Sequence, residues 1–260
     1  MAVRQRPSQG APGQHFLRSS RLAAEIVKDA GIAPGDLVVD VGAGTGVITR
    51  ALLDAGAEVV AVELDPGLAA DLRRRFAPRG ARVVEDDARS WTWPRDPFSV
   101  VSNLPFTGSG EILSSLLGDP TRRLEHASVI VQWELAEKQA AVWPATMRAT
   151  YWRAWFEIAI VGRLARSAFA PPPSVDAAVL RFLRRHRPLV PPDEHLRYRK
   201  LLADAFRAQA PLRHALRGQV TPRELRRLAT YLGFEPGSRA RDLDAYQWAG
   251  LFDYARRVRR

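Results

Sequence analysis

The strongest constraint on the fold lies in residues 37–63, where two short apolar runs flank a glycine-rich turn and an amphipathic stretch. The first run (37–41) and the last (58–63) have the near-continuous hydrophobicity of buried parallel strands. The stretch between them has apolar residues at helical spacing and ends at Gly56, which is typical of a helix C-cap. A strand, a helix and a strand within about 30 residues form a βαβ unit, which requires a parallel sheet with a right-handed crossover.

The alternation of strands and helices continues along the chain and predicts an α/β fold with a mostly parallel, Rossmann-like sheet. Two later β-type stretches, 154–164 and 176–183, have only a proline-rich loop between them, which favours an antiparallel hairpin at the sheet edge. That addition is typical of methyltransferase-like sheets more than of dehydrogenases. The other strands are expected at 82–85, 98–102 and 127–133, and the helices at 19–30, 47–53, 66–77, 109–117 and 134–142.

Past residue 184 the chain changes to a basic, proline-rich stretch that is followed by helical patterns only. Residues 184–192 are interpreted as a stiff linker. Thr221 and Glu224 form a capping box, so a helix is expected to begin there. Other helices are expected at about 193–208, at 211–217 and from about 242. The predicted divisions are a flexible basic segment (1–18), an α/β domain (19–184) and a small, basic, all-helical domain (185–260).

The positive charge of the chain is confined to one end. The formal net charge is +11, yet residues 1–180 contain 20 basic and 20 acidic side chains, whereas residues 181–260 contain 19 and 8. A GC-rich genome explains the preference for arginine over lysine, but it does not explain this asymmetry. A basic end attached to a neutral part indicates a polyanionic partner, either nucleic acid or an anionic membrane.

Several classes of protein are excluded by composition. The chain has no cysteine, which excludes a disulfide scaffold, a thiol nucleophile and a cysteine-ligated zinc site. Its five histidines show no paired ligand spacing, so we expect no metal. There is no apolar run long enough to span a membrane and no signal-peptide pattern at the N-terminus, so a soluble, cytoplasmic protein is expected.

Polar and glycine residues follow three of the predicted parallel strands. Gly42, Gly44 and Gly46 lie after the first strand in a G-x-G-x-G pattern, which is tighter than a dinucleotide fingerprint and is by itself also compatible with a plain tight turn. Glu63 ends the second strand, where a carboxylate can bind both hydroxyls of a ribose or can simply be solvated. Asp87 follows the third strand and can accept from the amine of an adenine. Together these features predict an adenosine-containing ligand across the sheet edge.

The fourth strand is followed by residues 102–106, Ser-Asn-Leu-Pro-Phe. The exocyclic amine of a nucleobase is a poor nucleophile, because its lone pair is delocalised into the ring. If hydrogen-bond acceptors hold both N–H bonds, the nitrogen becomes tetrahedral and its lone pair can attack a methyl group. The Asn103 side-chain oxygen and the main-chain carbonyl of Leu104 or Pro105 can supply these acceptors. Pro105 restrains this backbone, and Phe106 can stack on an extruded base and face a sulfonium. An ordinary turn after a strand is the alternative.

Further motifs accompany these features along the chain. The full set is QHFL (14–17), VGAGTG (41–46), Glu63, Asp87-Ala88, NLPF (103–106), VQWE (131–134) and FAPPPSVD (169–176). With these motifs the chain resembles the rRNA adenine-N6 dimethyltransferase superfamily from about Gln14 to its end. Within that superfamily it looks like the Erm branch, especially its actinobacterial members; this branch methylates an adenine of 23S rRNA at the macrolide site. Phe106 stands where the housekeeping small-subunit branch usually has tyrosine, and His15 stands where many Erm proteins have asparagine.

This resemblance implies S-adenosylmethionine as the cofactor, bound by the catalytic domain, and an RNA-binding role for residues 185–260. Asn103, Pro105 and Phe106 are the expected catalytic residues, and Phe169 is the expected second wall of a base slot opposite Phe106. A core position for Phe169 is the alternative. The expected cofactor contacts are His15, Leu17, Gly42, Gly44, Glu63, Asp87 and Asn103.

The implied function is N6-methylation of 23S rRNA, free of or early in ribosome assembly, by a monomer that gives resistance to macrolide, lincosamide and streptogramin B antibiotics. One or two methyl groups are compatible with the same residues. Small-subunit (16S) rRNA dimethylation, DNA adenine methylation and non-catalytic nucleic-acid binding are the alternatives. The expected phosphate contacts are Arg4, Arg6, Arg18, Arg21, Arg226, Arg227 and the arginines of 256–260.

Overall fold

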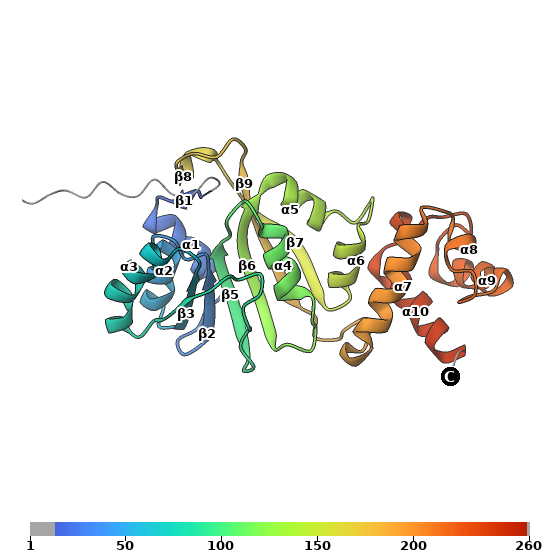
Figure 1. The fold of residues 1–260 in the computed structure, drawn as a ribbon. Coiled ribbons are helices and arrows are strands. Elements are labelled where there is room, and N and C mark those ends of the chain that lie inside the picture. The colour runs from blue at the N-terminus through green and yellow to red at the C-terminus, as the bar shows by residue number, and fades with distance from the viewer. Residues whose placement is uncertain (1–13, 259–260) are drawn as a thin grey trace, which may run out of the picture.

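Residues 14–258, the part that the computed structural model describes, contain one seven-stranded sheet with the order β4-β3-β2-β5-β6-β9-β7 (Figure 1). Strands β2 to β6 are mutually parallel, and β9 runs antiparallel to both of its neighbours. The predicted α/β class with an antiparallel edge hairpin is therefore confirmed. The strands are β2 (Leu37–Val41), β3 (Glu58–Glu63), β4 (Arg82–Glu85), β5 (Phe98–Asn103), β6 (Leu124–Gln132), β7 (Phe156–Leu164) and β9 (Ala177–Arg184).

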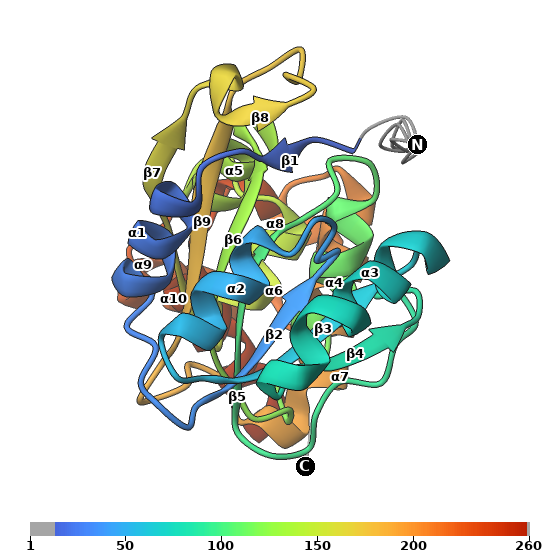
Figure 2. The ribbon, with the colours of Figure 1, turned by 90° about the vertical axis from the view of Figure 1, so that its left-hand side faces the viewer.

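Helices cover both faces of the sheet, because successive residues of each buried strand point to opposite sides. Val38 of β2 packs with α1, α2 and α3, whereas Val39 and Val41 belong to the core on the other face, which includes α4 and α6. Figure 2 shows α1, α2 and α3 in front of the strands. The helices are α1 (Ser20–Asp29), α2 (Val47–Asp54), α3 (Pro66–Phe76), α4 (Ser109–Leu117), α5 (Trp133–Ala140) and α6 (Met147–Arg153).

Three features differ from the predicted elements. Strand β6 begins at Leu124 rather than at residue 127, and its first residues pair with β5 across a register shift between Phe98 and Ser99. Helix α6 was not expected. A second, two-stranded sheet joins β1 (Phe16–Leu17) to β8 (Phe169–Ala170), which connects the start of the described chain to the proline-rich loop.

The C-terminal helices share a core with the sheet. The same hydrophobic cluster contains Val100 of β5, Trp155 and the helical residues Tyr198 and Trp248. The Trp155 indole donates to the carbonyl of Val190 at 2.8 Å. These helices are α7 (His195–Ala208), α8 (Leu212–Ala215), α9 (Pro222–Leu232), which has the predicted Thr221–Glu224 capping box, and α10 (Ala245–Val258).

The segment interpreted as a linker is held by its own arginines. The Arg184 guanidinium donates to the carbonyls of Pro120, Arg122 and Leu124, and the Arg185 Nε donates to the carbonyl of Arg153 at 2.8 Å. These bonds attach the start of the segment to the sheet and to α6. Part of the basic charge of this region is therefore used in contacts within the protein.

Candidate functional site

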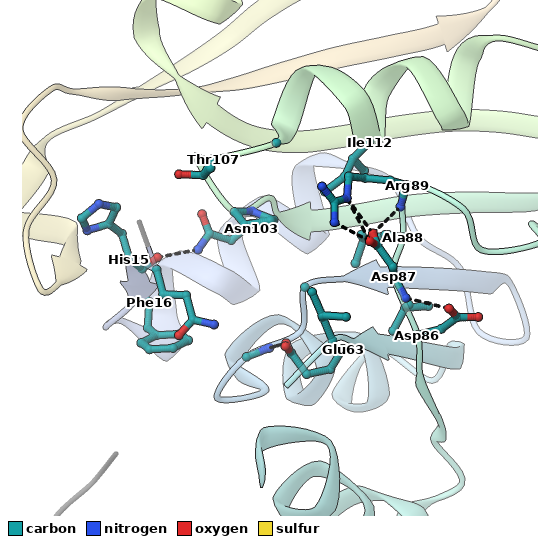
Figure 3. Close-up of a pocket in the computed structure, with 18 residues that line it drawn as sticks. His15, Phe16, Glu63, Asp86, Asp87, Ala88, Arg89, Asn103, Thr107 and Ile112 are labelled. Atoms are coloured by element: carbon teal, nitrogen blue, oxygen red, sulfur yellow. Dashed lines mark hydrogen bonds and ion pairs between the residues drawn. The ribbon is translucent and has the colours of Figure 1, made fainter. Parts of the chain in front are cut away.

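A cavity of about 290 Å³ opens at the carboxyl ends of β2, β3 and β5 (Figure 3). Open α/β sheets bind their ligands at this edge. Leu17, Phe106 and Phe169 do not line the cavity; Leu17 lines a smaller hollow behind the glycine turn. The predicted residues that line it are His15, Gly42, Gly44, Glu63, Asp87, Asn103 and Pro105.

The glycine turn is shaped by protein neighbours as well as by the cavity. Gly42 and Gly44 have φ values of +63° and +53°, in the left-handed region that L side chains rarely adopt. A Cβ atom on Gly42 would lie 3.0 Å from Cδ of Pro105, and one on Gly44 would lie 2.7 Å from the Phe16 ring. The absence of side chains therefore lets the turn pack directly against the Asn-Leu-Pro-Phe loop and against β1.

Glu63 is held in place by main-chain donors. Its Oε2 accepts from the Gly44 N–H at 2.8 Å and its Oε1 accepts from the Asp65 N–H at 2.9 Å, while the side chain is almost fully buried. Each carboxylate oxygen retains a second lone pair. The geometry therefore allows the predicted binding of two vicinal hydroxyls of a ribose.

A second buried carboxyl, Asp40, lies at the end of β2 and was not singled out from the sequence. It is 1% exposed, and its Oδ2 accepts from Oγ1 of Thr49 at 2.7 Å. Burial raises the pKa of Asp40 from 3.8 to about 7; the Thr49 hydrogen bond opposes this shift, and the nearby charge of Glu63 adds to it. An acidic residue among the valines of a buried strand was the available sequence signal.

The carboxylate of Asp87 is shared with Arg89, which sequence reasoning also missed. The Arg89 Nε lies 2.9 Å from both carboxylate oxygens, and Arg89 itself lines the cavity (Figure 3). This guanidinium holds the pKa of Asp87 below its usual range. An adenine amine that binds Asp87 must therefore use the lone pairs that Arg89 leaves, since an ionised carboxylate has about four.

The amide of Asn103 has a defined orientation. Its Nδ2 donates to the main-chain carbonyl of His15 at 2.8 Å, and because a carbonyl can only accept, the nitrogen and oxygen are assigned by this contact. Oδ1 is buried and has no hydrogen-bond partner among residues 14–258. A buried acceptor without a partner costs about 1–3 kcal/mol, so this oxygen is suited to a donor from a ligand.

Three rings meet beside Asn103. The centroids of Phe106 and Phe169 are 5.9 Å apart at an interplanar angle of 66°, an edge-to-face contact, and Phe169 is fully buried. The His15 ring lies 5.2 Å from Phe106, tilted by 51°. As the structure stands, Phe106 and Phe169 do not flank an open base slot, and Phe169 occupies the core position that was its alternative role.

The arginines expected to contact RNA lie in different surroundings. Arg226 and Arg227 are exposed on α9, at the end of the helical part farthest from the sheet (Figure 1), and Arg18 and Arg21 are exposed near β1. Arg256 and Arg257 both pair with Asp253. Arg4, Arg6, Arg259 and Arg260 lie outside the described residues, as does most of the predicted flexible segment 1–18.

Residues 14–258 contain neither a candidate metal site nor a candidate membrane-spanning helix. No group of three or more histidine, aspartate and glutamate side chains is placed to hold a metal ion within that range. No helix in the same range is long and apolar enough to cross a membrane.

Known proteins with related sequences include rRNA methyltransferases. Residues 9–257 match the family described as ribosomal RNA adenine dimethylase. An rRNA adenine N-6-methyltransferase of Bacillus licheniformis is 30% identical, in an alignment that covers 93% of this chain and 85% of the relative. The mycinamicin-resistance protein MyrB of Micromonospora griseorubida is 34% identical, in an alignment that covers 95% of this chain and 78% of MyrB. The ribosomal RNA small subunit methyltransferase A of Thermosynechococcus vestitus is also 34% identical, covering 95% and 96%.

Solved structures give the same fold. The 23S rRNA methyltransferase ErmE has a TM-score of 0.79 at 28% identity, with coverage of 92% of this chain and 98% of its own. A dimethyladenosine transferase from Plasmodium falciparum has a TM-score of 0.73 at 19% identity, with coverage of 94% and 98%, a likeness that concerns the fold alone.

Proposed function

Since the chain belongs to the ribosomal RNA adenine dimethylase family, we propose that it methylates N6 of an adenine in 23S rRNA at the macrolide-binding site and so gives resistance to macrolide, lincosamide and streptogramin B antibiotics. Family membership makes the chain an rRNA adenine N6-methyltransferase that uses S-adenosylmethionine. The choice of 23S rRNA and the resistance are the proposed part.

The residues around the cavity fit this cofactor. Glu63 has both oxygens directed by main-chain donors and lone pairs left for the ribose hydroxyls, and Asp87 lies beyond it for the adenine. The glycine turn brings main chain without side chains to the same cavity. When bound, the cofactor supplies a methyl group on a sulfonium, a good electrophile that needs no metal.

The single observation that carries the mechanism is the buried Oδ1 of Asn103, which has no hydrogen-bond partner within residues 14–258. This oxygen accepts one N–H of the target amine, and a main-chain carbonyl of the Leu104–Pro105 segment accepts the other. The Pro105 carbonyl already accepts from the Ser109 hydroxyl at 2.6 Å, which stiffens the loop. With both N–H bonds held, the nitrogen lone pair would be free to accept the methyl group that a bound cofactor would supply, and the nitrogen would lose one proton to water.

The Asn-Leu-Pro-Phe and Val-Gln-Trp-Glu motifs, which resemble the Erm branch, favour 23S over 16S rRNA as the substrate. The 28% identity to ErmE over nearly the whole chain is compatible with this choice. The 34% identity to a small-subunit methyltransferase keeps 16S rRNA as the second candidate. The charge at the C-terminal end suits contacts to rRNA phosphates in either case.

The test is methyl transfer from labelled S-adenosylmethionine to protein-free 23S and 16S rRNA, followed by mapping of the modified base by primer extension. Label at one adenine of 23S rRNA at the macrolide site is the expected result. Label in 16S rRNA alone would overturn the proposed substrate while leaving the family activity intact.

The role of Asn103 is tested by Asn103→Ala. We expect the single-turnover rate to fall by about 100-fold or more, as when one preorganised hydrogen-bonding group is removed from other active sites. S-Adenosylmethionine affinity, measured by calorimetry, should change little by comparison. A variant with near-normal turnover would contradict the assignment of Oδ1 as the amine acceptor.

A further inference from the structure

The side chain of His15 lies against Phe106, the residue expected to stack on a target base. Its ring contacts Phe106 at a centroid distance of 5.2 Å, and its Nδ1 lies 2.8 Å from the carbonyl oxygen of Pro171 in the proline-rich loop. The main chain of the same residue accepts from Asn103. His15 therefore touches the catalytic amide, the stacking aromatic and the loop after β8.

The hydrogen bond to Pro171 defines the state of the ring. A carbonyl oxygen can only accept, so Nδ1 carries the hydrogen. The ring is thus held at two points, by this donor and by the contact with Phe106. The ring therefore has a fixed position beside Phe106, unlike a free surface side chain.

The rings that contact Phe106 lie too close to it for a base to stack between them. Stacked bases are about 3.4 Å apart, so a base between two rings needs centroids about 7 Å apart. The observed distances are 5.2 Å to His15 and 5.9 Å to Phe169, and Phe106 is only 9% exposed. Oδ1 of Asn103 is buried as well. Adenine therefore stacks on Phe106 only after one of the two neighbouring rings moves.

We propose that the His15 imidazole is a gate on the base slot, which lies against Phe106 and is displaced when adenine binds. This inference rests on the proposed function. His15 is the ring that moves because Phe169 is fully buried and its strand is paired with β1, whereas His15 is half-buried and lines the cavity (Figure 3). His15 is thus a positioning residue that sets how readily a base gains access, in addition to its expected contact with the cofactor.

The composition of the chain offers a direct probe. Asn103 is its only asparagine, so selective ¹⁵N-asparagine labelling gives a single side-chain amide signal in NMR spectra. Adenosine is added as a probe of the base slot while saturating S-adenosylhomocysteine occupies the cofactor site. Removal of one hydrogen bond and one aromatic contact favours access by about tenfold, so His15→Ala should shift the Asn103 signal at about tenfold lower adenosine concentration than the wild type.

Two variants complete the design. His15→Phe keeps a ring on Phe106 without a donor for Pro171 and should fall between wild type and His15→Ala, whereas His214→Ala, an exposed histidine of α8, should match wild type. With rRNA, kcat/KM for His15→Ala should rise by a similar factor when S-adenosylmethionine is saturating. Equal or weaker adenosine response in His15→Ala, or no response in either protein, overturns the gate. Failure of the proposed function shows separately, as absence of methyl transfer by the wild type.

Discussion

The free energy of unfolding should fall as pH rises, because Asp40 is a buried carboxyl. Burial raises its pKa from 3.8 to about 7 in the folded chain. As pH rises, the unfolded chain ionises first, so the contribution of the protonated carboxyl is complete below about pH 4 and is lost as pH rises to about 7. At 1.36 kcal/mol per pKa unit, the total loss is about 4 kcal/mol, of which about 2–3 kcal/mol falls between pH 5 and pH 8.

The substitution Asp40→Asn removes this ionisation and keeps an acceptor for Thr49. The free energies of unfolding of variant and wild type, measured by urea titration at pH 5 and pH 8, should therefore differ in a pH-dependent manner. The variant should gain about 2–3 kcal/mol relative to wild type between the two pH values, whatever constant offset the amide introduces. Asp96→Asn, at an exposed loop position, is the control. An offset for Asp40→Asn that is the same at both pH values would refute the reasoning.

Other changes test the turn, the core and the basic end. Gly44→Ala forces a side chain into a left-handed conformation and against Phe16, which costs roughly 1–2 kcal/mol for the backbone alone; calorimetry should show S-adenosylmethionine affinity reduced about tenfold or more. Trp155→Ala should lower the free energy of unfolding by about 3–5 kcal/mol in urea, because the indole is fully buried and bonded to Val190; a loss below 1 kcal/mol would argue against a shared core. Replacing Arg226 and Arg227 by Gln should lower the slope of log Kobs against log salt concentration for rRNA binding by the amount expected for about two phosphate contacts. An unchanged slope would exclude both as contacts.

The parts of the fold that rest on local pattern could be predicted from the sequence. The βαβ unit at β2, α2 and β3 combines apolar runs, glycines and a C-cap within a short span, and the hairpin of β7 and β9 follows from two β-type stretches without a helix between them. The family resemblance, now confirmed, rests largely on motifs at the ends of β2, β3, β4, β5 and β6.

The parts that depend on distant pairing could not be predicted. Strands β1 and β8 have two residues each and are separated by about 150 positions, so neither carries a periodic signal. Helix α6 has only seven residues. The orientation of the Asn103 amide depends on the main chain of His15, 88 residues away, and the buried position of Phe169 follows from the same β1–β8 pairing. Sequence motifs name such residues without showing what covers them.

The place of β9 between β6 and β7 has a consequence for synthesis on the ribosome. The N-terminus leaves the ribosome first, so β9 is the last strand of the sheet to appear. It nevertheless lies inside the sheet and not at its edge. Until residues 177–184 have left the exit tunnel, β6 and β7 both present unpaired edges, and β1 lacks its partner until β8 has been made. Nascent chains that stall between β7 and β9 are therefore the species most exposed to aggregation through open strand edges.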